Sequence, residues 1–127
     1  MPPAPSLMRR LALPLDLLVV LIFVAIGRSV HAHGTSLGGL ASTTWPFAVG
    51  LAAGWLVLHW RGRPGLTIGD GALVDVVTVA VGMVLRVVSG QGTAFAFVVV
   101  ALCFLGAGMV GWRLLARLRL PVRRAPG

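Results

Sequence analysis

Apolar residues dominate four long stretches of this chain, and short polar or basic segments separate them. The stretches cover approximately residues 11–30, 41–60, 71–89 and 93–115. Each is close to the about 20 residues that a helix needs to cross a hydrocarbon core of about 30 Å. The pattern therefore predicts an all-α membrane protein with four transmembrane helices.

Residues that favour helix ends occur near the start of three stretches. Pro14 suits a first helical turn, and Asp70 can cap the third helix. Thr43 or Thr44 can cap the second helix, whose first turn then contains Pro46. We expect the helices to begin close to these residues.

The composition agrees with a chain surrounded by lipid. Of 127 residues, 57% are hydrophobic and 11% are charged, which leaves too little polar surface to cover a soluble domain of this size. We expect residues 11–115 to form one transmembrane domain in the lipid bilayer. Residues 1–10 are expected to be a disordered basic tail and residues 116–127 a basic tail, with disorder over residues 121–127.

The chain contains no lysine, so arginine supplies its formal positive charge. The chain has 11 basic residues, all arginine, against three aspartates, for a net charge of +8. If four helices span, nine arginines fall on one side: Arg9, Arg10, Arg61, Arg63, Arg113, Arg117, Arg119, Arg123 and Arg124. The positive-inside rule makes that side, with both termini, cytoplasmic. These segments suit anionic lipid headgroups, and their scatter along the chain does not indicate a nucleic-acid surface.

The first stretch has an alternative interpretation. The arginines at 9–10, the apolar residues 17–26 and the segment 30–32 resemble the three regions of a secretory signal peptide. However, an aspartate and an arginine bracket the stretch, which is atypical of a cleaved leader. We therefore expect a retained helix.

The first and third stretches share a charge layout. Asp16 and Arg28 bracket the first, and Asp75 and Arg86 bracket the third. A shift of 57–59 residues aligns these pairs and also matches Gly50 with Ala107, Gly54 with Gly111, and Trp55 with Trp112. Because an even number of spans separates equivalent positions, the pattern predicts two hairpins related as parallel repeats. Similarity of apolar composition alone is the alternative.

Small residues mark candidate packing positions on the second and fourth helices. Gly50 and Gly54 form a GxxxG pattern, and Ala107 and Gly111 have the same spacing. Small residues allow helix backbones to approach closely in a bilayer. We predict helix packing within the bundle at these four residues, with a dimer interface as the alternative.

The charged residues of the repeat form two layers. Asp16 and Arg28 are separated by about 18 Å of helix rise, and Asp75 and Arg86 by about 16 Å, so neither pair can bridge within one helix. We interpret Asp16 as a first-turn carboxylate that the helix dipole favours and that can meet the arginines at 9–10. Asp75 lies deeper, where a functional role and a buried ion pair both stay open.

Arg28, Arg86 and His31 lie toward the outer side in this topology. For the two arginines, interfacial anchoring and a role in an anion or proton path stay open. His31 and His33 have no third external ligand, so no metal site is predicted. A pH-sensitive or hydrogen-bonding role suits His31 better. The candidate polar path comprises Asp75, Arg86, Arg28, Asp16 and His31.

The chain contains four distinctive short segments: Gly-Arg-Ser-Val-His-Ala-His-Gly at 27–34, Thr-Trp-Pro-Phe at 44–47, Gly-Met-Val-Leu-Arg at 82–86 and Gly-Trp-Arg at 111–113. With Gly50 and the Gly-Trp pair at 54–55, they resemble the small prokaryotic membrane family catalogued as domain of unknown function 3054. The resemblance covers about residues 11–113. It implies a four-helix protein of a prokaryotic cell membrane, with no assigned activity.

No P-loop, dinucleotide fingerprint, HExxH motif or nucleophile elbow occurs in the chain. We therefore expect no enzymatic activity and no cofactor. The expected function is a small transporter or channel subunit for an unknown small solute or ion, acting as a homo-oligomer or with a membrane partner subunit. The alternative is a non-catalytic scaffold or accessory subunit of a larger membrane complex.

Overall fold

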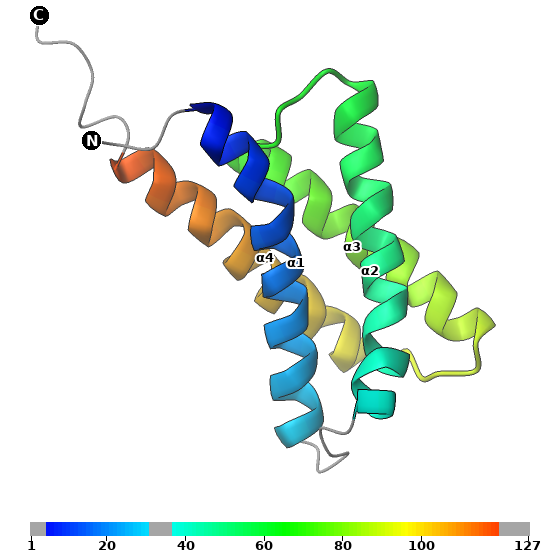
Figure 1. Cartoon of the computed structure of the whole chain (residues 1–127). Coiled ribbons are helices and arrows are strands. Elements are labelled where there is room, and N and C mark those ends of the chain that lie inside the picture. The colour runs from blue at the N-terminus through cyan, green and yellow to red at the C-terminus, as the bar shows by residue number, and fades with distance from the viewer. Residues whose placement is uncertain (1–4, 31–36, 120–127) are drawn as a thin grey trace, which may run out of the picture.

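The computed structural model describes residues 5–30 and 37–119, and these form four α-helices (Figure 1). The helices are α1 (Pro5–Val30), α2 (Leu37–Trp60), α3 (Ile68–Val88) and α4 (Phe95–Arg119). Each contains an apolar segment of 21 to 24 residues, which is long enough to cross a bilayer. The prediction of an all-α chain with four helices of spanning length is confirmed, and these helices indicate a membrane protein.

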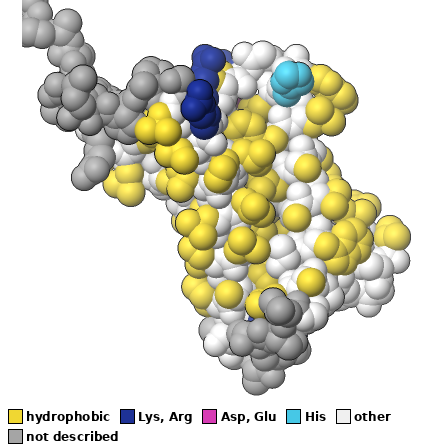
Figure 2. Space-filling model, in the orientation of Figure 1, with side chains coloured by type: hydrophobic (Ala, Val, Ile, Leu, Met, Phe, Trp, Pro, Cys, Tyr) yellow, Lys and Arg dark blue, Asp and Glu magenta, His cyan; other side chains and the backbone are white. Residues whose placement is uncertain are grey.

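Each described helix packs against two neighbours, so the helices form a ring in the order α1, α2, α3, α4. In Figure 1, α1 and α2 lie in front and the inclined α3 and α4 lie behind them. Hydrophobic side chains are spread over the face shown in Figure 2, whereas arginine and histidine gather at one end. Large apolar residues such as Leu18, Val84 and Leu115 are at least half exposed, as expected for side chains that contact lipid.

The helix ends differ from the predicted ones. Because α1 begins at Pro5 and α2 at Leu37, Pro14 and Pro46 lie inside helices, and the prediction that they mark first turns is wrong. Membrane helices tolerate interior prolines where neighbouring groups satisfy the freed backbone. Residues 5–10 and 116–119, expected in the tails, also belong to α1 and α4.

The start of α3 is fixed by Thr67 and not by Asp70. The hydroxyl of Thr67 accepts a hydrogen bond from the Asp70 backbone N–H at 3.0 Å, and the Asp70 carboxylate accepts one from the Thr67 N–H at 3.4 Å. This capping box places Asp70 three residues inside the helix. Arg63 also donates to Asp70 at 2.9 Å, which ties the α2–α3 loop to the helix start.

Glycines bring α2 and α3 close together. A Cβ on Gly50 would collide with the carbonyl oxygen of Thr78, and one on Gly54 would lie 3.3 Å from the Cα of Val74. On α3, a Cβ on Gly82 would lie 3.0 Å from the Phe47 ring. The GxxxG pattern of α2 therefore packs against the α3 backbone.

On α4, close approaches occur at different small residues from the predicted ones. Gly106 lies against Asp75 of α3, and Gly108 lies against Val19 of α1. Ala107 is exposed, and a Cβ on Gly111 would meet no heavy atom within 4 Å. The repeat alignment gave the wrong positions here because α4 presents a different face to its neighbours.

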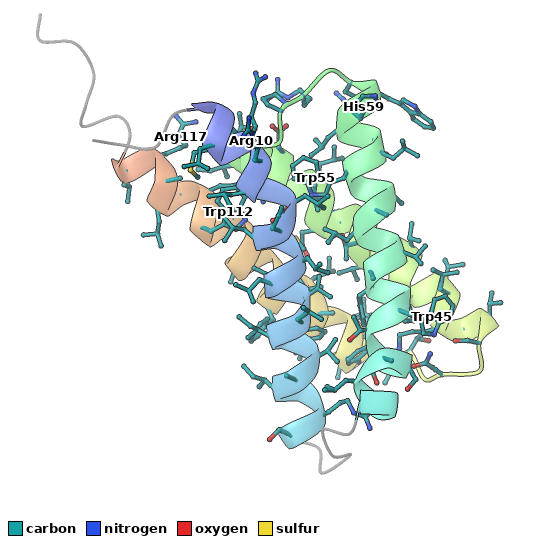
Figure 3. The ribbon with its side chains drawn as sticks, in the orientation of Figure 1. Arg10, Trp45, Trp55, His59, Trp112 and Arg117 are labelled. Carbon is teal, nitrogen blue, oxygen red and sulfur yellow. The ribbon has the colours of Figure 1, made fainter. Side chains whose placement is uncertain are left out.

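Asp16 is completely buried and pairs with Arg113 of α4. Arg113 Nη2 lies 2.7 Å from Asp16 Oδ2, and Nη1 lies 2.8 Å from Oδ1. The indole N–H of Trp55 donates to Oδ2 at 2.9 Å, and that of Trp112 donates to Oδ1 at 2.8 Å. Figure 3 shows Trp55 between α1 and α2, and Trp112 between α1 and α4. One carboxylate thus connects three helices.

Arg113 also holds the α2–α3 loop. Its Nε donates to the carbonyl of Gly65 at 2.8 Å, and Nη1 donates to the carbonyl of Met109 at 3.0 Å. Gly65 has a φ of +84°, and a Cβ there would collide with Trp55, so the loop requires glycine at this position. A Cβ on Gly71 would lie 2.9 Å from Arg113 Cδ, so Gly71 makes room for the arginine on α3.

The expected environment of Asp16 is therefore corrected. The residue lies eleven positions after Pro5, the first residue of α1, and not in a first turn. Its cationic partner comes from α4 and not from the arginines at 9–10. The helix dipole contributes little so far from the helix end.

Replacing Gly50 with alanine should destabilise the bundle, because the added methyl group collides with rigid α3 backbone. We expect a loss of about 1–3 kcal/mol in the free energy of unfolding, typical of overpacking. Gly111→Ala is the matched control, since its methyl group enters open space. Thermal unfolding of both variants in the same detergent measures the difference, and equal melting temperatures would contradict this description of the α2–α3 contact.

Replacing Asp16 with asparagine should leave the Arg113 charge buried without a counter-charge. We expect a loss of about 3–5 kcal/mol in the free energy of unfolding. Asp70→Asn affects an ion pair whose arginine is 46% exposed, so its effect should be about 1 kcal/mol or less. Denaturant titration followed by tryptophan fluorescence tests this order, and a smaller effect at Asp16 than at Asp70 would refute it.

Candidate functional site

A pocket of about 910 Å³ lies at the end of the bundle remote from the Asp16–Arg113 pair. All four helices contribute to its lining, and Arg28 of α1 and Arg86 of α3 both face it. We call this cavity the two-arginine pocket. Its other lining residues are polar (Ser42, Thr43, Ser89, Gln91), aromatic (Phe23, Trp45, Phe97) or small and aliphatic (Val24, Gly27, Ala94, Ala96, Val100). Figure 3 shows Trp45 at this end of α2.

Arg28 lies in the last turn of α1 and reaches across to α2. Its Nη1 donates to the hydroxyl of Thr43 at 2.8 Å. A Cβ on Gly39 would collide with the Arg28 guanidinium, so this glycine makes room for the group beside α2. The side chain is therefore half-buried and held at the wall of the pocket.

Arg86 occupies the corresponding last turn of α3 and is held by uncharged groups. Its Nε donates to the carbonyl of Gly92 at 2.8 Å, and Nη1 donates to Gln91 Oε1 at 3.1 Å. The guanidinium carbon lies 4.6 Å from the centre of the Phe97 ring, a cation–π contact. Gln91 in turn donates to the carbonyl of Ser42, which ties the α3–α4 loop to α2.

No acidic side chain is among the described residues that line the two-arginine pocket. The three aspartates of the chain lie elsewhere: Asp16 pairs with Arg113, Asp70 pairs with Arg63, and Asp75 packs against Gly106. The pocket therefore has a net positive charge. Guanidinium groups held in place in this way bind carboxylate, sulfonate or phosphate oxygens well.

Aromatic side chains form the inner wall of the two-arginine pocket. The ring of Phe23 lies 5.7 Å from that of Phe47, 6.0 Å from that of Phe97 and 5.3 Å from that of Phe104. These residues come from α1, α2 and α4, and no sequence spacing predicts that they meet. Phe23 and Phe97 line the pocket, and Phe47 and Phe104 extend this aromatic cluster beyond the pocket lining.

Asp75 lies between the two ends of the bundle on α3. It is 7% exposed, and its Oδ1 has no hydrogen-bond partner among the described residues. Thr78, three residues further along the same helix, is completely buried, and its hydroxyl also lacks a partner in the described part of the chain. Unsatisfied buried polar atoms are rare in folded proteins, and inside a membrane they commonly mark functional positions.

A smaller cavity of about 210 Å³ lies at the opposite end from the two-arginine pocket. Met8, Leu66, Thr67, Trp112, Ala116 and Arg117 line it. Trp112 thus lines this cavity, while its indole N–H donates a hydrogen bond to Asp16. The Asp16–Arg113 pair and the aromatic cluster both lie between the two cavities.

The predicted site residues are therefore divided among three places. Arg28 and Arg86 line the two-arginine pocket, Asp75 lies in the middle, and Asp16 lies at the opposite end with Arg113. We call this opposite end the sealed end, because both of these charged side chains are completely buried. His31 lies outside the described residues. Arg113 was not among the predicted site residues, because its position near the end of an apolar stretch is also typical of membrane-flanking arginines. Only its adjacency to Trp112, the match of Trp55, distinguished it in the sequence.

Comparison with known proteins places the chain in a family. Residues 13–116 match the model of a family described as protein of unknown function (DUF3054). No curated protein and no solved structure matches the chain. The match covers more than half of the 127 residues and confirms the resemblance seen in the short sequence segments. The chain belongs to the DUF3054 family of proteins of unknown function.

Proposed function

We propose that this protein is a small membrane transporter, or the solute-binding subunit of one, that takes up an anion through the two-arginine pocket. The observation that supports the proposal is the convergence of Arg28 and Arg86 on one cavity with no acidic lining residue in the described structure. A charged side chain near a bilayer is costly unless it is used or can reach the interface. Two such charges from different helices at one cavity are better suited to binding than to anchoring.

Asp75 favours a transport path through the bundle over a binding site at its surface alone. Three positions mark the path along α3: Gly71, then Asp75, then Arg86. Gly71 is the one that packs against Arg113. Asp75 is thus one helical turn from the sealed end and about three turns from the pocket. Its unpartnered oxygen offers a polar position between the two cavities.

The scaffold alternative accounts less well for these positions. Charges that only fix the depth of a helix lie near its ends and reach lipid headgroups or water. Asp16, Arg113 and Asp75 are instead buried among the helices. We also propose that the protein is not an enzyme, since an anion-binding cavity and two internal carboxyl groups serve transport without bond chemistry.

We further propose that the two-arginine pocket faces the outside of a prokaryotic cell membrane. The arginines at 9–10, Arg61, Arg63 and Arg117 all belong to the opposite end of the bundle. Figure 3 shows Arg10 and Arg117 there. By the positive-inside rule that end is cytoplasmic.

This orientation predicts the labelling of two single cysteines in a Cys103→Ala background. Cys103 is exposed on α4, so its replacement should be tolerated. A membrane-impermeant maleimide should label Ser89→Cys in intact cells and Arg61→Cys only after permeabilisation. Both residues are exposed in connecting segments, so the two variants control for each other. The opposite labelling pattern would reverse the proposed orientation.

If the protein is an anion transporter, the Arg86→Gln and Asp75→Asn variants should fold but no longer take up the anion. Purified protein in liposomes should take up benzenesulfonate, which does not cross bilayers as a neutral acid. We expect the initial uptake rate of both variants to fall to that of protein-free liposomes, because one lacks a binding charge and the other lacks the internal carboxyl group.

Arg61→Gln is the matched control for Arg86→Gln, because it removes an exposed arginine at the opposite end. It should keep the wild-type uptake rate. Melting temperatures in detergent establish that the variants are folded. Wild-type protein that takes up no more than empty liposomes, or variants that match the wild type, would refute a transport function.

A further inference from the structure

The two-arginine pocket has chemically different outer and inner parts. Arg28 and Arg86 lie in the last turns of α1 and α3, at the end of the bundle. Val24 is one turn deeper on α1, about 6 Å further inside. On α4, which begins at Phe95, Phe97 and Val100 extend the apolar wall in the same inward direction. The pocket is therefore basic at its rim and apolar inside.

The size of the pocket does not suit a bare inorganic anion. A volume of about 910 Å³ lies near the upper end of the range of about 300–1,000 Å³ that is usual for organic ligands. A hydrated inorganic ion would leave the aromatic and aliphatic wall in contact with water, at a hydrophobic cost. An occupant with an apolar body removes that wall from water.

The two arginines at the rim, Arg28 and Arg86, are preorganised to bind one charged head group. Arg86 is held by Gly92, Gln91 and Phe97, and Arg28 is held by Thr43, so the binding charges are already placed. Preorganised groups lose little entropy when a ligand binds. The hydroxyl of Ser42 and the side chain of Gln91 add polar groups beside the arginines.

We propose that the two-arginine pocket binds a single-chain organic anion, with its charged head at Arg28 and Arg86 and its apolar body against Phe23, Phe97 and Val100. This inference rests on the transport function proposed above and names its substrate class. The ligand is a free solute and not a membrane phospholipid, because a volume of about 910 Å³ lies within the range that is usual for small organic ligands. Head and body each contribute to affinity, so neither a short anion nor a neutral chain binds comparably.

Binding is tested with purified protein in nanodiscs of zwitterionic lipid, with the fluorescence of Trp45 as the signal. Octanesulfonate is the probe, and methanesulfonate, octanol and octyltrimethylammonium are the comparison compounds. We expect octanesulfonate to bind at least about tenfold more tightly than each of them. Trp45→Phe should lose the fluorescence change, since the remaining tryptophans do not line the pocket.

Two pairs of variants locate the two parts of the site. Arg86→Gln should weaken octanesulfonate binding by about tenfold or more, whereas Arg61→Gln should not change it. Gly27→Phe should fill the pocket and abolish binding, because Gly27 lines the pocket and a Cβ there would meet no heavy atom within 4 Å. Gly111→Phe is the matched control: it fills equally open space on α4, away from the pocket, and should bind as the wild type does.

The outcomes separate this inference from transport itself. Equal affinity for methanesulfonate and octanesulfonate would overturn the inference even if both anions are transported. Tight octanesulfonate binding that the Gly27→Phe and Arg86→Gln variants lose would support it even if no uptake occurs. If nanodiscs with anionic phospholipid alone produce the Trp45 change and octanesulfonate then adds nothing, the occupant is a lipid headgroup and the inference is wrong.

Discussion

The ion pair of Asp16 and Arg113 is the interaction on which the rest of the bundle depends. It joins the first helix to the last, and so closes the ring of described helices. Two charges inside a low-dielectric bundle are stable only if their remaining hydrogen-bonding groups are also satisfied. The indoles of Trp55 and Trp112 and the carbonyls of Gly65 and Met109 meet this requirement. The position of the α2–α3 loop therefore follows from the same pair.

The internal repeat stays a prediction, but two of the residue pairs that it aligns share a site in the structure. Trp55 and Trp112 donate to the two oxygens of one carboxylate, and Arg28 and Arg86 line one pocket. The aspartates do not follow this pattern, because Asp16 has four donors and Asp75 Oδ1 has none in the described structure. The two ends of the bundle therefore differ. At one end the charges of Asp16 and Arg113 are buried and paired, and at the other end Arg28 and Arg86 face a cavity.

The sequence predicted the parts of this structure that depend on local composition. Four apolar stretches were enough to give the helices, and the spacing of Gly50 and Gly54 gave a close helix contact. The partner of Asp16 was not predictable, because it lies 97 residues away and nothing in one sequence connects them. Treating Pro14 as a helix start then gave Asp16 the wrong environment. Similarly, Gly111 was assigned to packing by its alignment with Gly54, although the rotation of α4 depends on contacts that the sequence does not encode locally.

The two ends of the bundle differ in how strongly they resist movement. At the sealed end, separating α1 from α4 breaks a buried ion pair and leaves the indole N–H of Trp112 without its acceptor, so that end moves only at a large cost. At the other end, Arg86 is held by a backbone carbonyl, an amide side chain and an aromatic ring, each of which a ligand oxygen can replace or supplement. Glycines border this end of the fold at Gly27 and Gly39. No carboxylate among the described lining residues neutralises the two-arginine pocket, whereas Asp16 neutralises Arg113, so only the two-arginine pocket presents its positive charge to a ligand.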